Sequence, residues 1–155
     1  MRAFVRKTAF TMIELVFVIV VLGILAVIAI PKLAATRDDA EISRMGSDIM
    51  TGSFEVAAYV VAKGEVNAIM SNMSNAIRTA VSAGIATERP RHVSFKMGSI
   101  DDCVMLDINQ SSDGNVEEIQ LSYADASGDT LCLGLQEIVD EGKFPIPLKG
   151  NKVVR

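Results

Sequence analysis

The sequence predicts an α+β fold, in which a long amino-terminal helix precedes a second helix and a small antiparallel sheet of about four strands. Residues 10–30 are almost wholly apolar, and beyond them apolar side chains recur every three or four residues to about residue 83. After residue 92 the pattern changes, and apolar and polar residues alternate in short runs separated by Gly, Asp and Ser. A period near 3.6 is typical of helices and a period of two is typical of strands, which together give this fold class.

Residues 10–30 have the length and composition of a helix that crosses a membrane. Thr11 and Glu14 are the polar residues in this run, and its 21 positions make a helix of about 31 Å at about 1.5 Å per residue. The hydrocarbon core of a bilayer is about 30 Å thick. Residues 1–9 carry three basic residues and no acid, which predicts a cytoplasmic amino terminus and an external position for the bulk of the chain.

Residues 1–30 are open to three interpretations. An ordinary secretory signal has an apolar region of about 7 to 15 residues without an internal acid, whereas this run is longer and contains Glu14. A plain transmembrane anchor suits the length, and Glu14 lies one turn inside it, where its side chain can reach the interface at reduced cost. The third interpretation depends on the order of the residues around Glu14.

Ten residues around Glu14 have a specific order. They read Arg6-Lys7-Thr8-Ala9-Phe10-Thr11-Met12-Ile13-Glu14-Leu15. This order resembles the cleavage and methylation motif of type IV pilins and type II secretion pseudopilins, in which a basic leader and a small residue precede Phe-Thr-Leu-Ile-Glu-Leu. The chain departs from that pattern at Ala9, where the family usually has glycine, and at Met12, where the family has leucine.

The resemblance implies how the amino terminus is processed and used. A membrane-embedded prepilin peptidase would cleave between Ala9 and Phe10 and methylate the new amine of Phe10. Thr11, Glu14 and Pro31 would then take positions that serve assembly in the family. The charged amine would lie in an apolar environment, where a neighbouring subunit's Glu14 can neutralise it, since an unpaired buried charge is costly. Glu14 is therefore expected to fix the stagger between adjacent helices.

On this interpretation the chain has four parts. They are a prepilin leader (1–9), a transmembrane and assembly helix (10–30), an amphipathic continuation of that helix (31–64) and an α/β head (65–155). Pro31 lacks an amide hydrogen and is expected to kink the helix where it leaves the membrane, and Gly64 is expected to end the helix. The continuation carries an apolar stripe made of Ile42, Met45, Ile49, Val56 and Val60.

The head begins with the predicted second helix, residues 65–83, whose apolar side chains recur every four positions and would share one face. These side chains are Ile69, Met73, Ile77 and Val81. A turn or linker at residues 87–91 separates this helix from the predicted sheet. The predicted strands are residues 92–97, 103–109, 117–123 and 130–138, and an irregular tail follows at 143–155.

Cys103 and Cys132 both lie in the part of the chain that is expected outside the cytoplasm. In an oxidising compartment an even number of cysteines suggests a disulfide. The alternation of apolar residues puts each cysteine on the face of its predicted strand opposite to the leucines and valines. A bridge between two neighbouring strands is therefore predicted, closing a loop of roughly 30 residues. The alternative is a pair of buried, unpaired thiols.

Oxygen-bearing side chains gather around Gly114 and suggest a calcium site. The candidate ligands are Asp107, Asn109, Asp113 and Glu117. Their spacing differs from that of an EF-hand loop, and Asp113-Gly114 is also a standard hairpin turn. The turn is the favoured interpretation, and no cofactor is expected apart from this calcium candidate.

No enzyme site is predicted. His92 is the single histidine, and no candidate nucleophile lies near it in the sequence, so a surface or edge histidine is the simpler interpretation. The sequence contains no phosphate-binding glycine loop, zinc-type spacing or basic-aromatic stripe. Beyond residue 9 there are 12 basic and 19 acidic residues, a net charge of −7. This charge disfavours nucleic acid as a partner, except through a DNA-uptake pilus.

The resemblance implies a structural subunit of a type II secretion pseudopilus or a related type IV pilus. A pseudopilin is preferred, because the head is small and has one cysteine pair. The expected partners are prepilin peptidase, the inner-membrane assembly platform, membrane lipid, and other copies or homologous pilin subunits. The expected location is the inner membrane, with a single pass and a periplasmic head, and then the filament. The competing interpretation is a bitopic membrane protein whose periplasmic head binds, senses or catalyses.

Overall fold

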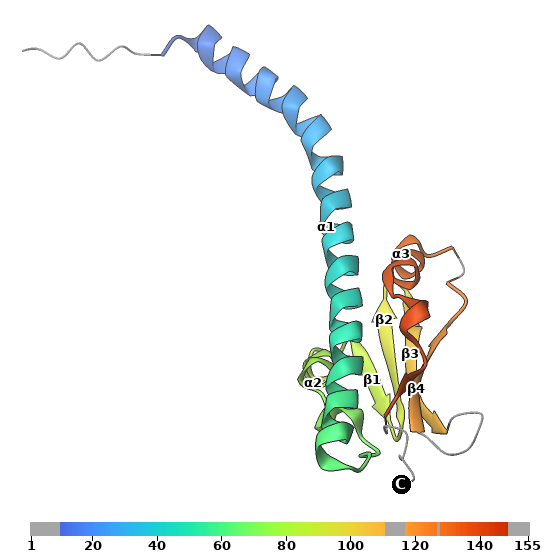
Figure 1. Ribbon diagram of the computed structural model, residues 1–155. Coiled ribbons are helices and arrows are strands. Elements are labelled where there is room, and N and C mark those ends of the chain that lie inside the picture. Colours follow the sequence, from blue (N-terminus) through green and yellow to red (C-terminus); the bar gives the residue numbers. More distant parts are fainter. Residues whose placement is uncertain (1–9, 111–116, 127, 149–155) are drawn as a thin grey trace, which may run out of the picture. The chain divides into compact units, whose positions relative to one another are not determined.

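The computed structural model describes residues 10–110, 117–126 and 128–148 (Figure 1). In chain order its elements are α1 (Met12–Lys63), η1 (Met70–Asn72), α2 (Asn75–Ser82), β1 (Ala86–Arg89), β2 (His92–Met97), β3 (Ile100–Gln110), β4 (Glu117–Tyr123), α3 (Thr130–Ile138), η2 (Glu141–Lys143) and β5 (Ile146–Pro147). The strands form one antiparallel sheet in the order β1-β2-β3-β4-β5. The predicted α+β fold is confirmed, and the arrangement is consistent with a pilin-like fold.

The chain divides after Asp39 into two compact units, and α1 contributes to both. The first unit contains the start of α1, which continues as a helix across Pro31. The kink expected at Pro31 stays a prediction. Between residues 10 and 30 the large apolar side chains are exposed, from 38% for Val21 to 82% for Phe10. The described residues of this unit therefore bury no core of their own.

The second unit is built around one hydrophobic core. The apolar stripe predicted on the continuation of the long helix faces this core. Its first residue, Ile42, is half-buried, and the other four are buried, namely Met45, Ile49, Val56 and Val60. Helices α2 and α3, the sheet and the segments next to them, among them Met70 of η1 and Leu148 after β5, supply the remaining buried side chains. The largest of those from the sheet are Phe95, Met97, Leu106, Ile108 and Ile119. The core therefore forms among α1, the two shorter helices and one face of the sheet.

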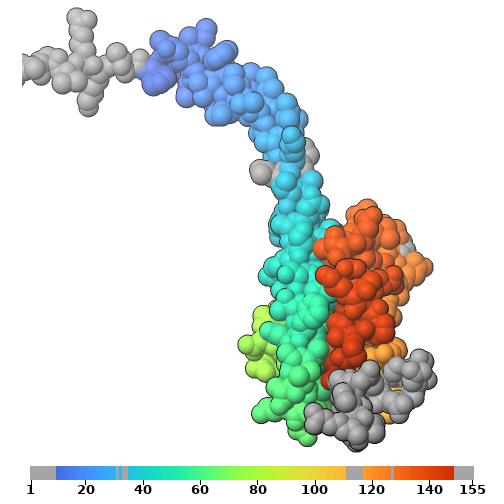
Figure 2. All heavy atoms as spheres, viewed as in Figure 1, coloured from blue at the N-terminus to red at the C-terminus, as the bar shows by residue number. Residues whose placement is uncertain are grey.

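Two glycines allow other elements to approach α1 closely. A Cβ atom at Gly46 would lie 2.6 Å from Cδ1 of Ile138 in α3, and one at Gly52 would lie 2.9 Å from Cγ1 of Ile77 in α2. Figure 2 shows the segment that contains α3 (orange to red) packed along α1 (cyan to green). Glycine weakens a helix interior by about 1 kcal/mol relative to alanine, and here the absence of a side chain makes room for this packing.

The second helix is shorter than predicted. Helix α1 ends directly before Gly64, as expected, but residues 65–83 hold the short 3-10 turn η1 and then α2. The hydroxyl of Ser74 accepts a hydrogen bond from the Ile77 N–H and caps α2, and this hydroxyl itself donates to Glu55 at 2.7 Å. A serine favours a cap over a helix interior, which explains why the predicted helix is divided at Ser74.

Strands β2 and β4 have the predicted bounds, and β3 extends beyond its predicted bounds at both ends. Strand β1 occupies part of residues 87–91, where a turn or linker was expected. The turn is confined to Pro90 and Arg91, so β1 and β2 form a hairpin. Strand β5 is likewise a short strand within the tail that was expected to be irregular, and residues 149–155 lie outside the described residues.

Residues 130–138 form α3, so the fourth predicted strand is wrong. Alternate leucines suggested a strand, but the buried residues are Cys132 and Leu135, which are three positions apart, while Leu133 is 48% exposed. A spacing of three is typical of one helix face. The carboxylate of Asp129 caps the start of the helix, and leucine is a good helix former.

Candidate functional site

The first turn of α1 is closed by two polar residues, Thr11 and Glu14. Because α1 begins at Met12, Thr11 is the N-cap and Glu14 follows three residues later. The N–H and the hydroxyl of Thr11 donate to Oε2 of Glu14 at 2.8 and 2.7 Å. In return the Glu14 N–H donates to the Thr11 hydroxyl oxygen at 3.3 Å. This reciprocal arrangement is a capping box.

The hydrogen bonds between Thr11 and Glu14 were not expected, although both residues were assigned to assembly. The signal is present in the sequence, because a threonine followed three residues later by a glutamate, at the start of an apolar run, is the signature of this cap. The carboxylate of Glu14 is therefore already paired within its own helix, before a second chain is considered.

The segment after this cap presents a continuous apolar surface. From Leu15 to Ile30 the sequence contains no polar side chain, and the large apolar side chains are exposed. Within the described part of the chain, α1 is the one helix that is long and apolar enough to cross a membrane, judged by length and composition. Figure 1 shows this segment (blue) as part of one continuous helical ribbon. Such a surface needs a cover of lipid or protein.

The other residues assigned to processing and assembly lie on either side of this cap. Phe10 directly precedes Thr11 and is exposed. Ala9 lies outside the described residues, so the structure describes the expected cleavage site only on the Phe10 side. Pro31 lies within α1, about six turns beyond Phe10. The structure thus brings Phe10, Thr11 and Glu14 together at the start of the helix and places Pro31 far along it.

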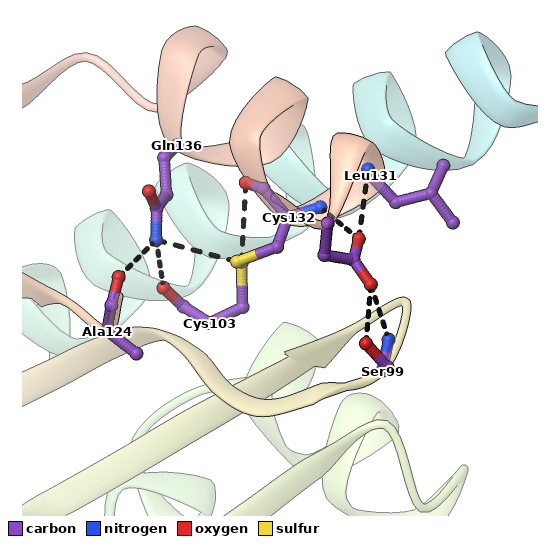
Figure 3. The surroundings of a disulfide bond; sticks show 7 residues. Ser99, Cys103, Ala124, Leu131, Cys132 and Gln136 are labelled. Carbon is purple, nitrogen blue, oxygen red and sulfur yellow. Dashed lines mark hydrogen bonds between the residues drawn. A yellow bond between two sulfur atoms is a disulfide. The ribbon is translucent and has the colours of Figure 1, made fainter. Parts of the chain in front are cut away.

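A disulfide joins Cys103 of β3 to Cys132 of α3 (Figure 3). Their Cα atoms lie 5.7 Å apart, and both residues are fully buried. A bridge between two strands was expected, and that part of the expectation is wrong because residues 130–138 form a helix. Beside the bridge, the amide of Gln136 donates to the carbonyl oxygens of Cys103 and Ala124, both at 2.9 Å. The disulfide and the amide therefore tie α3 to the sheet.

Asp129 connects the start of α3 to the turn between β2 and β3. Its carboxylate accepts hydrogen bonds from the N–H groups of Leu131 and Cys132, both at 3.0 Å. It also accepts from the N–H and hydroxyl of Ser99, at 2.8 and 2.7 Å. The Ser99 N–H is the largest cause that lowers the pKa of Asp129 to about 2, from 3.8. Gly98 has a φ of 59°, and a Cβ atom there would meet this carboxylate, so the turn requires glycine.

Comparison with known proteins does not assign the chain to a family. No family model, curated protein or solved structure matches it. The support for a function therefore comes from the chain's own residues, namely the motif order, the capped first turn of α1 and the apolar helix that follows.

The candidate calcium ligands do not converge within the described residues. Glu117 accepts a hydrogen bond from the guanidinium of Arg91 at 2.9 Å, and Asn109 donates to Gln120 at 3.0 Å. Asp113 lies outside the described residues. In the described ranges, no group of three or more His, Cys, Asp or Glu side chains could hold a metal ion. The structure thus gives the described candidates other partners.

His92 has a spatial partner that its sequence neighbours do not reveal. The register of β2 and β3 places Asp107 directly opposite His92, and Nδ1 of the imidazole lies 2.8 Å from Oδ1 of the carboxylate. Both side chains are half-buried. This contact depends on the register of the two strands, which is set by long-range packing. A cross-strand polar pair is the simplest interpretation of this contact.

Proposed function

We propose that the chain is a structural subunit of a pilus-like filament, either a type II secretion pseudopilus or a related type IV pilus. The observation that carries the proposal is the prepilin-like order of residues 6–15 at the head of an apolar helix with exposed side chains. A helix of this length and composition is stable when lipid or protein covers it. A filament subunit has both covers in succession, first the membrane and then other copies.

In the proposed cycle the head lies in the periplasm, and residues 1–9 are removed on the cytoplasmic side. Prepilin peptidase methylates the new amine of Phe10, next to the capping threonine. The described hydrogen bonds to the Glu14 carboxylate come from neutral groups of Thr11 and go to Oε2, so Oε1 can accept from a positive group. The amine of an adjacent subunit can pair there, because a buried charge needs a partner. Each such pair sets the register between two helices.

The proposed partners follow from this cycle. Lipid covers the apolar part of α1 before assembly, and an inner-membrane platform and other pilin subunits receive it afterwards. A pseudopilin is the preferred member of the class, because the described head is a small sheet with short helices and one disulfide. The described residues from Ala40 onward form a unit with a core of their own, which suits a head displayed on a filament.

The mass of the amino-terminal peptide tests the proposal. The chain is expressed with an active prepilin peptidase, extracted from membranes and digested for mass spectrometry. We expect N-methylated Phe10 as the first residue, whereas an inactive peptidase should leave residues 1–9 in place. If those residues are retained beside an active peptidase, the proposal is contradicted. The competing interpretation, a bitopic protein whose head binds, senses or catalyses, would then be favoured.

A further inference from the structure

A hollow of about 350 Å³ lies between α1 and the segment that forms η1 and α2. Figure 1 shows α2 beside the green part of α1. The lining residues include Glu55, Ala58, Tyr59, Met73, Ser74 and Arg78. All of them belong to the second unit, and the proposed function uses none of them. Two opposite charges and an apolar surface thus meet at a place that has no assigned role.

The negative charge in this hollow belongs to the half-buried Glu55 of α1. Its Oε2 accepts hydrogen bonds from the Ser74 hydroxyl at 2.7 Å and from the Ala76 N–H at 3.0 Å. Such bonds hold the carboxylate in place and favour its ionised form. Both donors are neutral, so Oε1 can accept from a positive group. Within the described ranges, Glu55 makes no ion pair.

The positive charge in the hollow belongs to Arg78 of α2. Its Nε donates to the carbonyl oxygen of Ser71 at 3.0 Å, which fixes the direction of the guanidinium. An arginine has five N–H donors, and those on its two Nη atoms can still bind a carboxylate in a bidentate manner. Among the residues that the structure describes, Arg78 also makes no ion pair. Glu55 and Arg78 therefore line one hollow without neutralising each other, since each is held by other hydrogen bonds.

Apolar surface lies beside these two charges, supplied by Ala58, Tyr59 and Met73. Ala58 and Tyr59 follow Glu55 by three and four positions in α1, so the three side chains share one face of the helix. A small-molecule site combines apolar surface with a few polar groups that fix the orientation of the ligand. Such sites have volumes of about 300 to 1,000 Å³, and this hollow is at the lower end of that range. Its size therefore suits a small molecule.

We propose that this hollow binds a free α-amino acid with an apolar side chain of medium size, such as leucine. The ammonium group of the ligand binds Oε1 of Glu55, and its carboxylate binds the Nη groups of Arg78. Its side chain packs on Ala58 and Met73. A zwitterion complements both charges at once, whereas a simple anion or cation leaves one of them unmatched. The inference goes beyond the proposed function and does not depend on it, because the whole site lies in the second unit.

Calorimetric titration of the full-length chain in detergent micelles with L-leucine tests the site. Two matched probes each lack one charge of the zwitterion: leucinamide lacks the carboxylate, and isocaproate lacks the ammonium group. We expect L-leucine to bind about tenfold more tightly than either probe, because each lost charge removes a charged hydrogen bond. An absence of L-leucine binding, or equal affinity for the three molecules, would overturn the inference.

Two substitutions identify the groups that bind each end of the ligand. Arg78→Gln should remove the preference for L-leucine over leucinamide, and Glu55→Gln should remove the preference over isocaproate. The Glu55→Gln side chain keeps an oxygen that accepts the hydrogen bonds from α2. Each preference is a ratio of affinities, so an unfolded fraction, which weakens binding of both ligands equally, cannot imitate its loss. Arg89→Gln and Glu65→Gln make the same changes at exposed positions outside the hollow and should retain both preferences. Preferences that survive Arg78→Gln and Glu55→Gln would overturn the inference.

Discussion

The carboxylate of Asp129 accepts hydrogen bonds from two elements, and one of its partners, Ser99, is 30 positions away in the chain. Hydrogen bonds from N–H groups favour the ionised form of a carboxylate, which explains the lowered pKa. The same bonds cap α3 and fix the turn before β3. The contribution of this one side chain to stability must therefore depend on pH.

Asp129→Asn is expected to lower the melting temperature near neutral pH, and to lower it less at acidic pH. The pKa of Asp129 in the folded protein is about 2, below its ordinary value of 3.8. Its stabilisation is therefore complete above about pH 4 and is lost as the pH falls through about 2. Thermal unfolding followed by circular dichroism at several pH values measures this difference. Asp102→Asn, at an exposed position of β3, is the control, and equal effects of the two substitutions would contradict the prediction.

At the scale of elements, periodicity predicted the long helix and the central strands well. Strands β2 and β4 have the bounds that alternation predicted, because alternate apolar residues of each strand, such as Phe95 in β2 and Ile119 in β4, pack into the core. The prediction of a strand at residues 130–138 was wrong because three alternating leucines in nine residues also fit a short helix. Strand β1 was missed because four residues gain their structure from pairing with β2.

The sequence named the residues of the candidate site but did not predict their contacts. The motif order places Thr11 and Glu14 at the start of the helix, while their mutual hydrogen bonds depend on where the helix begins. The disulfide connects a strand to a helix, which alternation of side chains could not indicate. The contact of His92 with Asp107 depends on strand register, and register is set by packing across the whole sheet.

Removal of the disulfide is expected to destabilise the head, because it frees α3 from β3. Replacing both Cys103 and Cys132 by alanine should lower the free energy of unfolding by about 2 to 5 kcal/mol, which urea titration would measure. The double substitution avoids a single unpaired thiol in the core. Thiol labelling of the native, unreduced protein provides the complementary test. Two reactive thiols in that experiment would contradict the disulfide.

The two units of the whole molecule need different surroundings. From Ala40 onward the described residues bury a core of their own, whereas the apolar side chains between residues 10 and 30 are exposed. No rearrangement within the first unit can cover a single helix on all sides. The exposed apolar surface of this unit therefore needs lipid or other chains to cover it.

Glu14→Gln is expected to leave membrane insertion intact and to impair assembly. Glutamine can retain the cap at this position, but it removes the negative charge and leaves a neighbour's amine unpaired. Crosslinked ladders from membranes, compared with the unsubstituted chain, measure assembly. Thr11→Ala is the matched control, because it weakens the cap by about 1 kcal/mol and keeps the carboxylate. If Thr11→Ala impairs assembly and Glu14→Gln does not, the cap matters and the charge does not.

The disulfide also determines what happens to a head whose backbone has been cut. Its cysteines are 29 positions apart, and the connection between β3 and β4 lies between them. When a protease hydrolyses a peptide bond in that connection, the disulfide keeps both fragments covalently joined. A nicked subunit would therefore migrate as one species until it is reduced. The persistence of a nicked head would depend on this single bond.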